Sequence, residues 1–555
     1  MKRFILTLIL ALAIPCSAVW AQVSLRDTTF SWQHHSFVLN DDHSIRSHST
    51  NDGDLDTVTF TRAKVIENEL VKLVLLPEYG GRVLSFIYKP TGYEYFYQSE
   101  CGSAYQINSG IFYYDWLMVY GGIFPTFPEP EHGKTWLLPW DFTVLKNSED
   151  TVRIRMQYTD STSYSRAPGS YNNGTTQMTC QVDVSVYKGS SLWDFDVKLI
   201  NNKNEEVRYE YWTCTTLAPG STIGNTGTPL NSEIVIPSEK YFAGWSPGSW
   251  IGRVNGIYDL DDIDYLSEWR DMGIAYADDF TGTYWGVLNH DNDEGVFRIS
   301  ENTETPGLKL WTWGRDNIDN NMFNFSNGGT DNYIELWAGV SEAFFRDARM
   351  PANGSAEWKE SYCATTNMSS ICDMNNHGVV NLIWDPEKLE LSYELNTFHT
   401  DSTYTIELGI KQESYQSLSS EQLTHSATGQ QKSITVEETD IPEGLYSVHC
   451  KLLSADNEEV LTCTQEVNNT TTGEGQLDMA AIDRIVFKRL DQRKIRAMLP
   501  EVNQYSAMVY TLGGQLINSF QFTADSVEIE FPAAGMYVLV IHDGIRASTE
   551  KVLVR

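Results

Sequence analysis

Short segments in which apolar and polar residues alternate recur along most of this chain, and few stretches hold a helical period. A period of two places one side of a strand on a core and the other in water, which favours antiparallel sheets. At 555 residues the chain is too long for one ordinary core. We therefore expect an all-β protein of several sandwich domains. The clearest strand patterns are residues 71–77, 82–88, 151–158, 181–187 and 192–200.

Tryptophan separates the first part of the chain from the rest. The sequence has 16 Trp residues, and none follows Trp384. We expect residues 22–372 to form a large antiparallel sandwich. Shorter alternating strands predict two small immunoglobulin-like β-sandwiches after it, at residues 374–468 and 480–555. Residues 469–479 are rich in Thr, Gly and Asn, and this composition indicates a linker.

The first 21 residues have the pattern of a secretory signal peptide. Lys2 and Arg3 form a charged start, residues 4–14 form an apolar run, and small residues precede the expected cleavage after Ala21. The run is too short to span a membrane, and no apolar run of about 20 residues occurs after it. We therefore expect an exported protein without a membrane span.

Cysteine usage agrees with export. One of the eight cysteines lies in the signal segment, which leaves seven in the exported chain. Two pairs lie close in sequence, Cys363 with Cys372 and Cys450 with Cys463. An oxidising compartment permits disulfides, so each pair is a candidate for a local bridge, although sequence alone does not give the connectivity.

The charge balance limits the partners of this chain. Asp and Glu number 74 against 40 Lys and Arg, which gives a formal net charge of -34. Such a surface repels the phosphates of nucleic acids and anionic membranes, so neither is expected as a partner. Neutral ligands such as sugars remain compatible with it.

Two motifs of the expected large sandwich contain polar side chains suited to a hydroxylated ligand. Arg82 follows a Gly-Gly bend, and its forked donors fit sugar hydroxyls, although a structural Arg fits the pattern equally well. The second motif has Glu129, Glu131 and His132 in a Trp-rich loop, with Trp140 behind them. Neighbouring carboxylates raise each other's pKa and His transfers protons, but solvated carboxylates are the commoner case.

A third candidate is a carboxylate between aromatic residues. Alternation places Tyr333, Glu335 and Trp337 on one face of a strand, and Trp313 ends the preceding aromatic string. Aromatic rings stack on sugar rings, and a carboxylate kept dry becomes a base that works near neutral pH. A carboxylate at the rim of an aromatic core is the alternative.

The segment His290 to Gly295 is the last candidate. Asp291 and Asp293 alternate before a Gly and are weak candidates for calcium ligands, while His290 is a candidate sugar contact. A hairpin turn between two strands explains the same residues. We favour the turn and expect no bound cofactor.

Residues 60–362 resemble the galactose mutarotase-like superfamily, a β-supersandwich fold, and within it an uncharacterised bacterial domain family. The resemblance rests on the Gly-Gly-Arg ending at Arg82, on His132-Gly133 with Trp140 downstream, and on Glu335, where epimerases have their general base. It also rests on the strings LWTWG and YIELWAG. Epimerases have a second His, and residues 209–214 contain none, so His132 or His290 would have to supply the acid.

Residues 480–555 are similar to the sorting domain of the type IX secretion system of Bacteroidetes. The similarity rests on Val509-Tyr510, Gly513-Gly514, the segment Gly535 to Leu539 and Lys551. It implies passage through the outer membrane by that secretion machinery, to the cell surface or the medium. The alternative is that residues 480–555 form a β-sandwich with an adhesive role.

Two functions stay open at this point. The one we favour is a secreted carbohydrate-active enzyme of hydrolase, lyase or epimerase type, which binds a glycan in a Trp-rich cleft. The other is a non-catalytic, secreted or surface-bound glycan-binding protein. In the enzyme, Glu335 is the expected base and His132 the expected acid. The expected substrate contacts are Arg82, Glu129, Glu131, Trp140, His290, Trp313 and Trp337.

Overall fold

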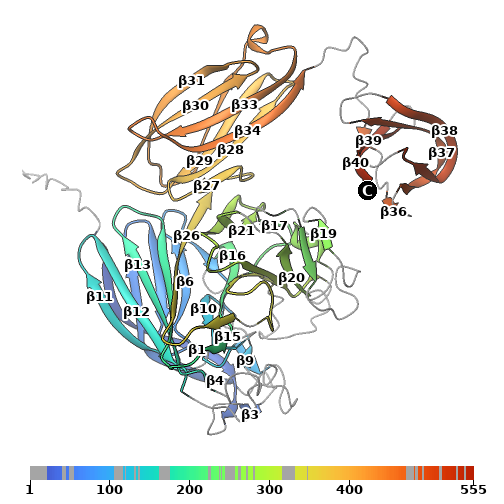
Figure 1. The fold of residues 1–555 in the computed structure, drawn as a ribbon. Coiled ribbons are helices and arrows are strands. Elements are labelled where there is room, and N and C mark those ends of the chain that lie inside the picture. The colour runs from blue at the N-terminus through green and yellow to red at the C-terminus, as the bar shows by residue number, and fades with distance from the viewer. Residues whose placement is uncertain are drawn as a thin grey trace, which may run out of the picture. The chain divides into compact units, whose positions relative to one another are not determined.

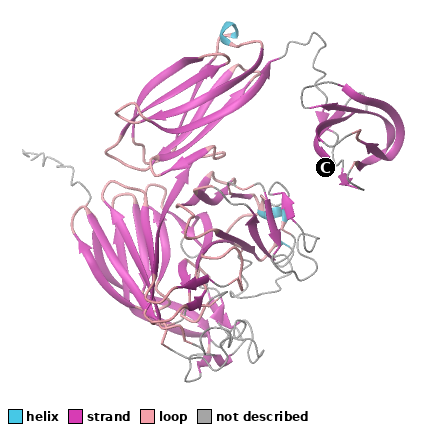
Figure 2. Ribbon diagram, in the orientation of Figure 1, coloured by secondary structure: helices cyan, strands magenta, loops and turns pink. Residues whose placement is uncertain are grey.

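The structure is a computed structural model of the chain, and its described residues fall into two compact units, 1–469 and 470–555. Nearly all regular structure is strand (Figure 2), and the helices of the described residues are the short turns η5 (Leu266–Glu268) and η6 (Glu438–Asp440). The prediction of an all-β protein of antiparallel sheets is confirmed. None of its described helices is long and apolar enough to cross a membrane. The structure describes residues 22–39, 45–48, 55–99, 101–104, 117–118, 121–129, 133–135, 138–161, 175–222, 227–236, 238, 240–243, 257–259, 264–269, 273–278, 282–315, 332–346, 348–469, 480–481, 486–489, 493–511, 516–532, 535–542 and 546–554.

Two large sheets stack to form the first domain (Figure 1). In spatial order, the described strands of the 14-stranded sheet are β19 (Ile257–Asp259), β18 (Lys240–Ala243), β20 (Gly273–Asp278), β23 (Gly307–Thr312), β24 (Ile334–Gly339), β16 (Trp212–Ser221), β10 (Ile123–Thr126), β6 (Arg82–Tyr88), β5 (Val71–Leu76), β4 (Leu55–Glu67), β1 (Ser24–His35), β8 (Cys101–Ala104) and β9 (Leu117–Met118), with β7 (Tyr93–Phe96) beside β6 and β16. Those of the 8-stranded sheet are β11 (Asp141–Asn147), β12 (Thr151–Thr159), β13 (Met178–Tyr187), β14 (Trp193–Asn201), β26 (Ser355–Thr366), β22 (Glu294–Ile299), β21 (Tyr284–Asn289) and β17 (Ser232–Val235). Two small ribbons pair β15 (Val207–Tyr209) with β25 (Ala348–Met350) and β2 (Phe37–Leu39) with β3 (Ile45–His48).

One apolar core lies between the two sheets. Phe86 and Phe96 of the larger sheet lie against Trp193 of the smaller one, with ring centroids 5.6 and 6.1 Å apart. Alternate residues of each strand enter this core, so the other residues of the larger sheet face away from it. Burial of each large apolar side chain stabilises the sandwich by about 1.5–3 kcal/mol.

A buried ion pair also connects the sheets. Arg298 of β22 donates from Nε to Glu360 Oε2 of β26 at 2.9 Å, and both side chains are fully buried. Thr213 of β16, in the other sheet, donates to Glu360 Oε1 at 2.7 Å. Trp358 and Tyr362 donate to the same carboxylate, each at 2.8 Å. Every lone-pair direction of this carboxylate is thus used inside the core, which is the condition for a buried charge to be tolerated.

The second domain is a sandwich of two four-stranded sheets in the same unit as the first. One sheet has β27 (Asp373–Asn375), β28 (Gly378–Asp385), β29 (Glu390–Thr397) and β32 (Gln430–Thr435). The other has β31 (Tyr415–Thr424), β30 (Thr403–Lys411), β33 (Gly444–Leu453) and β34 (Glu459–Asn469). The two domains share a small apolar cluster in which Leu192 and Phe297 lie with Met374 and Phe398.

The disulfide predictions were wrong. Cys372 is bonded to Cys463 across a sequence separation of 91, while Cys363 and Cys450 are buried free thiols. Cys372 directly precedes β27, and β27 is hydrogen-bonded to β34, where Thr462 N donates to Asp373 Oδ2 at 2.9 Å. This contact brings Cys372 to Cys463. Cys363 lies in the first domain, on the strand that ends it. Cys450 lies directly opposite Cys463 on the neighbouring strand, but the Cys463 sulfur is bonded to Cys372 instead.

The second unit is a curled sheet (Figure 1), antiparallel except for the short parallel pair of β35 with β40. Val509 and Tyr510 lie on its longest strand, and Leu539 on the neighbouring strand enters the same small core as Val509. The Gly513-Gly514 pair lies outside the described residues. The described strands are β35 (Ala480–Ala481), β40 (Arg546–Val554), β39 (Gly535–His542), β37 (Lys494–Thr511), β36 (Val486–Arg489) and β38 (Leu516–Glu530).

We predict that Glu360→Gln destabilises the protein by about 3–5 kcal/mol, because it leaves the Arg298 charge buried without a counter-ion. Thermal or urea unfolding of the full chain measures the change. Glu357→Gln is the matched control, since Glu357 lies on the same strand with 69% of its side chain exposed, and we expect it to leave the unfolding transition almost unchanged. Equal shifts in the two variants would contradict the role given to Glu360.

Candidate functional site

Five neighbouring strands of the larger sheet bring polar and aromatic side chains together on the face opposite the core. Cross-strand pairing places Phe124 of β10 opposite Cys214 of β16, and Lys309 of β23 opposite Trp337 of β24. We call the set formed by Arg82, Phe124, Cys214, Lys309, Glu335 and Trp337 the charged band. Two basic side chains, Arg82 and Lys309, and the Glu335 carboxylate thus lie among aromatic rings.

Glu335 is the carboxylate of the charged band. Lys309 donates from Nζ to Glu335 Oε2 at 3.1 Å, and the Tyr333 hydroxyl donates to Oε1 at 3.4 Å. The two charged side chains are 8% and 3% exposed. Burial raises the pKa of Glu335, although the Lys309 charge and hydrogen bonds from Lys309, Trp337 and Tyr333 lower it. A carboxylate in this setting accepts a proton more readily than an exposed one.

Lys309 is held by an aromatic face as well as by the carboxylate. Its Nζ lies 3.4 Å from the centre of the Trp337 ring, within the range of a cation–π interaction. Trp337 belongs to an apolar cluster with Phe124, Cys214 and Phe344. The ammonium thus has a carboxylate and an aromatic ring as neighbours in a setting that excludes most water.

Arg82 is the second cation, and its side chain is fully buried. It donates from Nε to Tyr79 O at 2.9 Å and from Nη1 to Gly121 O at 3.1 Å, and its guanidinium lies 4.4 Å from the centre of the Phe124 ring. Gly121 has φ +73°, and a Cβ there would lie 1.6 Å from Tyr97 O. Only glycine lets this carbonyl reach the guanidinium.

The pKa of the buried Cys214 thiol is affected by the charged groups of the band. Burial raises its pKa well above the ordinary value, and the Glu335 carboxylate adds to the rise. Lys309 and Arg82 both lower the same pKa. The thiol therefore stays neutral, and all three charged groups of the band act on its pKa.

An aromatic cluster flanks Glu335. Tyr97 stacks on Tyr333 with centroids 4.2 Å apart, and Trp311 contacts both Trp313 and Tyr333 at 4.6 and 5.5 Å. The structure thus brings Glu335, Arg82 and Trp337 into one band, with Trp313 in the flanking cluster. Sequence reasoning missed Lys309, although alternation in its own string places it on the same face as Trp311 and Trp313.

Glu129 lies in a different environment from Glu335. It is fully buried beyond the end of β10, and neither carboxylate oxygen has a hydrogen-bond partner among the described residues. Burial raises its pKa from about 4.5 to about 8; Lys134 opposes the rise, and Asp160 and Glu210 add to it. Lys134 itself pairs with Asp160 at 2.8 Å. Glu131 and His132, the other predicted residues of this loop, lie outside the described residues.

Two further predicted ligand contacts, Trp140 and His290, lie in other surroundings. Trp140 lies in the core between the sheets, fully buried, and donates from Nε1 to Thr135 O at 3.2 Å, so it is a core residue. His290 follows β21 in the 8-stranded sheet, where its Nε2 lies 2.7 Å from Glu233 Oε2. Its ring stacks on Tyr265 at 5.5 Å. Neither residue belongs to the charged band.

The acidic turn after His290 has the hairpin form. Asp291 and Asp293 lie between β21 and β22, and Asp293 has a positive φ of 55°, as tight turns require. Across the part of the chain that the structure describes, no group of three or more His, Cys, Asp or Glu side chains is arranged to hold a metal ion.

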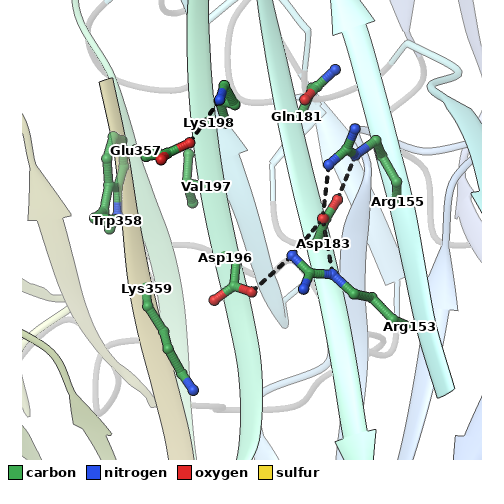
Figure 3. Close-up of a pocket in the computed structure, with 10 residues that line it drawn as sticks. All are labelled: Arg153, Arg155, Gln181, Asp183, Asp196, Val197, Lys198, Glu357, Trp358 and Lys359. Atoms are coloured by element: carbon green, nitrogen blue, oxygen red, sulfur yellow. Dashed lines mark hydrogen bonds and ion pairs between the residues drawn. The ribbon is translucent and has the colours of Figure 1, made fainter. Parts of the chain in front are cut away.

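The outer face of the 8-stranded sheet has a shallow hollow of about 480 Å³ (Figure 3). Asp183 receives both Arg153 and Arg155, at 2.7 and 2.6 Å. Lys198 pairs with Glu357 at 2.7 Å. The fourth cation, Lys359, pairs with Asp194 at 2.8 Å. Each cation that lines this hollow therefore has a carboxylate partner, as expected of a polar outer face stabilised by cross-strand ion pairs.

Comparison with known proteins places this geometry in context. Residues 54–193 match the sequence model of a domain family described as a domain of unknown function, DUF5107. The match covers strands of both large sheets, including the one that begins with Arg82.

Several solved structures are similar to the chain. A TPR-domain-containing protein from Parabacteroides distasonis is 15% identical with a TM-score of 0.51, over 63% of this chain and 56% of that one. The chain thus spans little more than half of that protein. A galactose mutarotase-like protein from Clostridium acetobutylicum is 9% identical with a TM-score of 0.38, over 60% of this chain and 98% of that one. A putative aldose 1-epimerase from Klebsiella pneumoniae is 13% identical with a TM-score of 0.39, over 62% and 91%. Identity this low concerns the fold alone.

We predict that stability of the wild type falls, relative to Glu129→Gln, as pH rises from 5 to 8. The folded chain keeps the Glu129 proton up to about pH 8, whereas the unfolded chain releases it near pH 4.5. Each pH unit between these values therefore costs the wild type about 1.4 kcal/mol. Unfolding in urea at several pH values measures the difference. The exposed Glu149 provides the control: Glu149→Gln should run parallel to the wild type, and a Glu129→Gln curve that does the same contradicts the assignment.

Proposed function

We propose that the first domain binds a carbohydrate at the charged band and acts on it by acid–base chemistry. The supporting observation is the buried Glu335 carboxylate, with Lys309 and Tyr333 as donors beside it and aromatic rings around it. Burial poises Glu335 as a base, and the rings supply flat apolar surfaces for sugar C–H groups. Burial also raises the pKa of the Tyr333 hydroxyl well above its usual value, so this group stays protonated.

The arrangement favours proton transfer by one carboxylate over hydrolysis by two. A glycoside hydrolase of the usual kind needs a second carboxyl group across the scissile bond. Of the two predicted partners, Glu131 lies outside the described residues, and Glu129 lies buried near Lys134, whose ammonium pairs with Asp160. The described proton donors next to Glu335 are Lys309 and Tyr333, which take the place of the missing epimerase histidine. We therefore propose an epimerase-like or lyase-like reaction.

A second candidate is a non-catalytic glycan-binding protein. The observation in its favour is that Lys309 already neutralises Glu335 within a buried ion pair. A carboxylate held in this way also serves to fix the aromatic surface around it. Binding without turnover would then be the function of the first domain.

We predict that Glu335→Gln keeps glycan binding and lowers turnover by about 10²–10⁴-fold, because the amide has the same shape but accepts no proton. The full chain is assayed on a glycan panel, with calorimetry for binding and chromatography for new reducing ends, unsaturated products or altered epimers. Glu357→Gln, on the outer face, serves as the control. Unchanged turnover in Glu335→Gln contradicts its role as base. Binding by both proteins without any product favours the non-catalytic alternative.

We also propose that the chain is exported and delivered to the outer membrane by the type IX machinery. The pattern of residues 1–21 and the resemblance of residues 480–555 to a sorting domain support this proposal. Fractionation of Bacteroidetes cells producing the full chain, or a chain ending at residue 479, measures it. We expect the full chain at the surface or in the medium and the shortened chain in the periplasm. Surface delivery of both contradicts the sorting role.

A further inference from the structure

The second domain places Cys463 within reach of two other cysteines. Cys372 is bonded to it, with the two Cα atoms 5.8 Å apart. Cys450 lies directly opposite Cys463 in the antiparallel pairing of β33 with β34 (Figure 1). Residues opposite each other in such a pair point to the same face, with Cα atoms about 4.5–5.5 Å apart. A disulfide requires Cα atoms about 4.4–6.8 Å apart, so either cysteine meets the distance condition for a bond to Cys463.

The three cysteines differ in their access to solvent. Cys450 and Cys463 belong to the core of the second domain and are 0% and 3% exposed. Cys372 directly precedes β27 and is exposed. A buried free cysteine ordinarily packs as a small apolar residue. A thiol that lies opposite a bonded cysteine is also placed for thiol–disulfide exchange.

The two bonds open to Cys463 join different parts of the fold. A bond to Cys450, which we call the hairpin bond, would join two strands of one sheet that already pair with each other. The bond to Cys372 joins β34 to the start of β27, which belongs to the other sheet. It needs β27 to be docked on β34, where Asn375 Nδ2 donates to Val460 O at 2.5 Å. Of the two bonds, only the one to Cys372 connects the sheets of the sandwich.

The hairpin bond is the easier one to form while the chain is open. Its cysteines are about 13 residues apart, whereas Cys372 and Cys463 have a sequence separation of 91. The closure entropy of a flexible loop grows with the logarithm of its length, so the shorter loop closes about 20 times as often. An external disulfide such as oxidised glutathione oxidises the two thiols and is itself reduced to two thiols. The hairpin bond then forms before β27 has docked.

We propose that Cys463 first bonds to Cys450 and is then transferred to Cys372 by exchange as the sandwich closes. The Cys372 thiolate attacks Sγ of Cys463, the bond to Cys450 breaks, and Cys450 leaves as a thiolate that takes a proton from water. One S–S bond forms and one breaks, so this step consumes no oxidant. Closure of the sandwich buries Cys450 and raises the pKa of its thiol to about 12. The thiol therefore stays protonated and does not attack back.

Timed trapping in the full chain tests the order of the two bonds. The reduced protein is refolded in a glutathione redox buffer, samples are quenched in acid and alkylated, and peptide mapping identifies the bonded cysteines. We expect the hairpin bond to appear first, to reach a maximum, and to decline while the bond between Cys372 and Cys463 accumulates. Accumulation of that bond with no hairpin bond before it overturns the proposal.

Three variants of the full chain separate exchange from packing. Cys450→Ala should form the Cys372–Cys463 bond about tenfold more slowly than the wild type, because only the longer loop is left to close. Cys363→Ala is the matched control, since it removes another fully buried free thiol, and it should form the bond at the wild-type rate. Cys372→Ala should keep the hairpin bond as its final product. Thermal unfolding establishes that each variant is folded.

The variants also show what would overturn the proposal. Equal rates in Cys450→Ala and Cys363→Ala would leave Cys450 as a packing residue only. Free thiols at both Cys450 and Cys463 in refolded Cys372→Ala would show that these two sulfurs do not bond. Where a variant does not fold, the order in which the two bonds appear in the wild type decides.

Discussion

The Arg298–Glu360 ion pair fixes how the two sheets of the first domain lie on each other. A buried pair is tolerated only when its geometry is good and its remaining polar atoms are bonded, and Thr213 of the opposite sheet supplies one of those bonds. The next residue on that strand, Cys214, points to the other face and lies at the centre of the charged band. A strand alternates its side chains, so the contact that holds Thr213 in the core also fixes the position of the site.

The first domain stabilises cations in two ways. On the outer face, carboxylates partner Arg153, Arg155 and Lys198, and the result is a neutral polar surface. In the charged band, Lys309 pairs with Glu335 and lies over the Trp337 ring, while Arg82 donates to two backbone carbonyls and lies over the Phe124 ring. Aromatic rings thus contact both buried cations of the band.

The sequence predicted the architecture because strand alternation is a local property that each segment carries by itself. Arg82, Glu335 and Trp337 could be chosen for the same reason, since each lies in a short string of aromatic or glycine neighbours. Cross-strand neighbours could not be predicted in this way. Lys309 meets Glu335 only through the pairing of β23 with β24, and Cys214 joins them through β16, which no local pattern encodes. The bond of Cys463 to Cys372 could not be predicted either, because it depends on how two strands far apart in sequence meet, while Cys450 lies opposite Cys463 and stays a free thiol.

The Cys372–Cys463 bond has a mechanical consequence. It joins the point where the chain enters the second domain to the strand by which it leaves, and so closes a covalent loop across a sequence separation of 91. A pulling force along the polypeptide enters at one sulfur and leaves at the other, bypassing the strands between them. While the bond is intact, the strands between the two sulfurs are therefore shielded from tension, and the load falls on the end of β34 after Cys463, which is paired with β33.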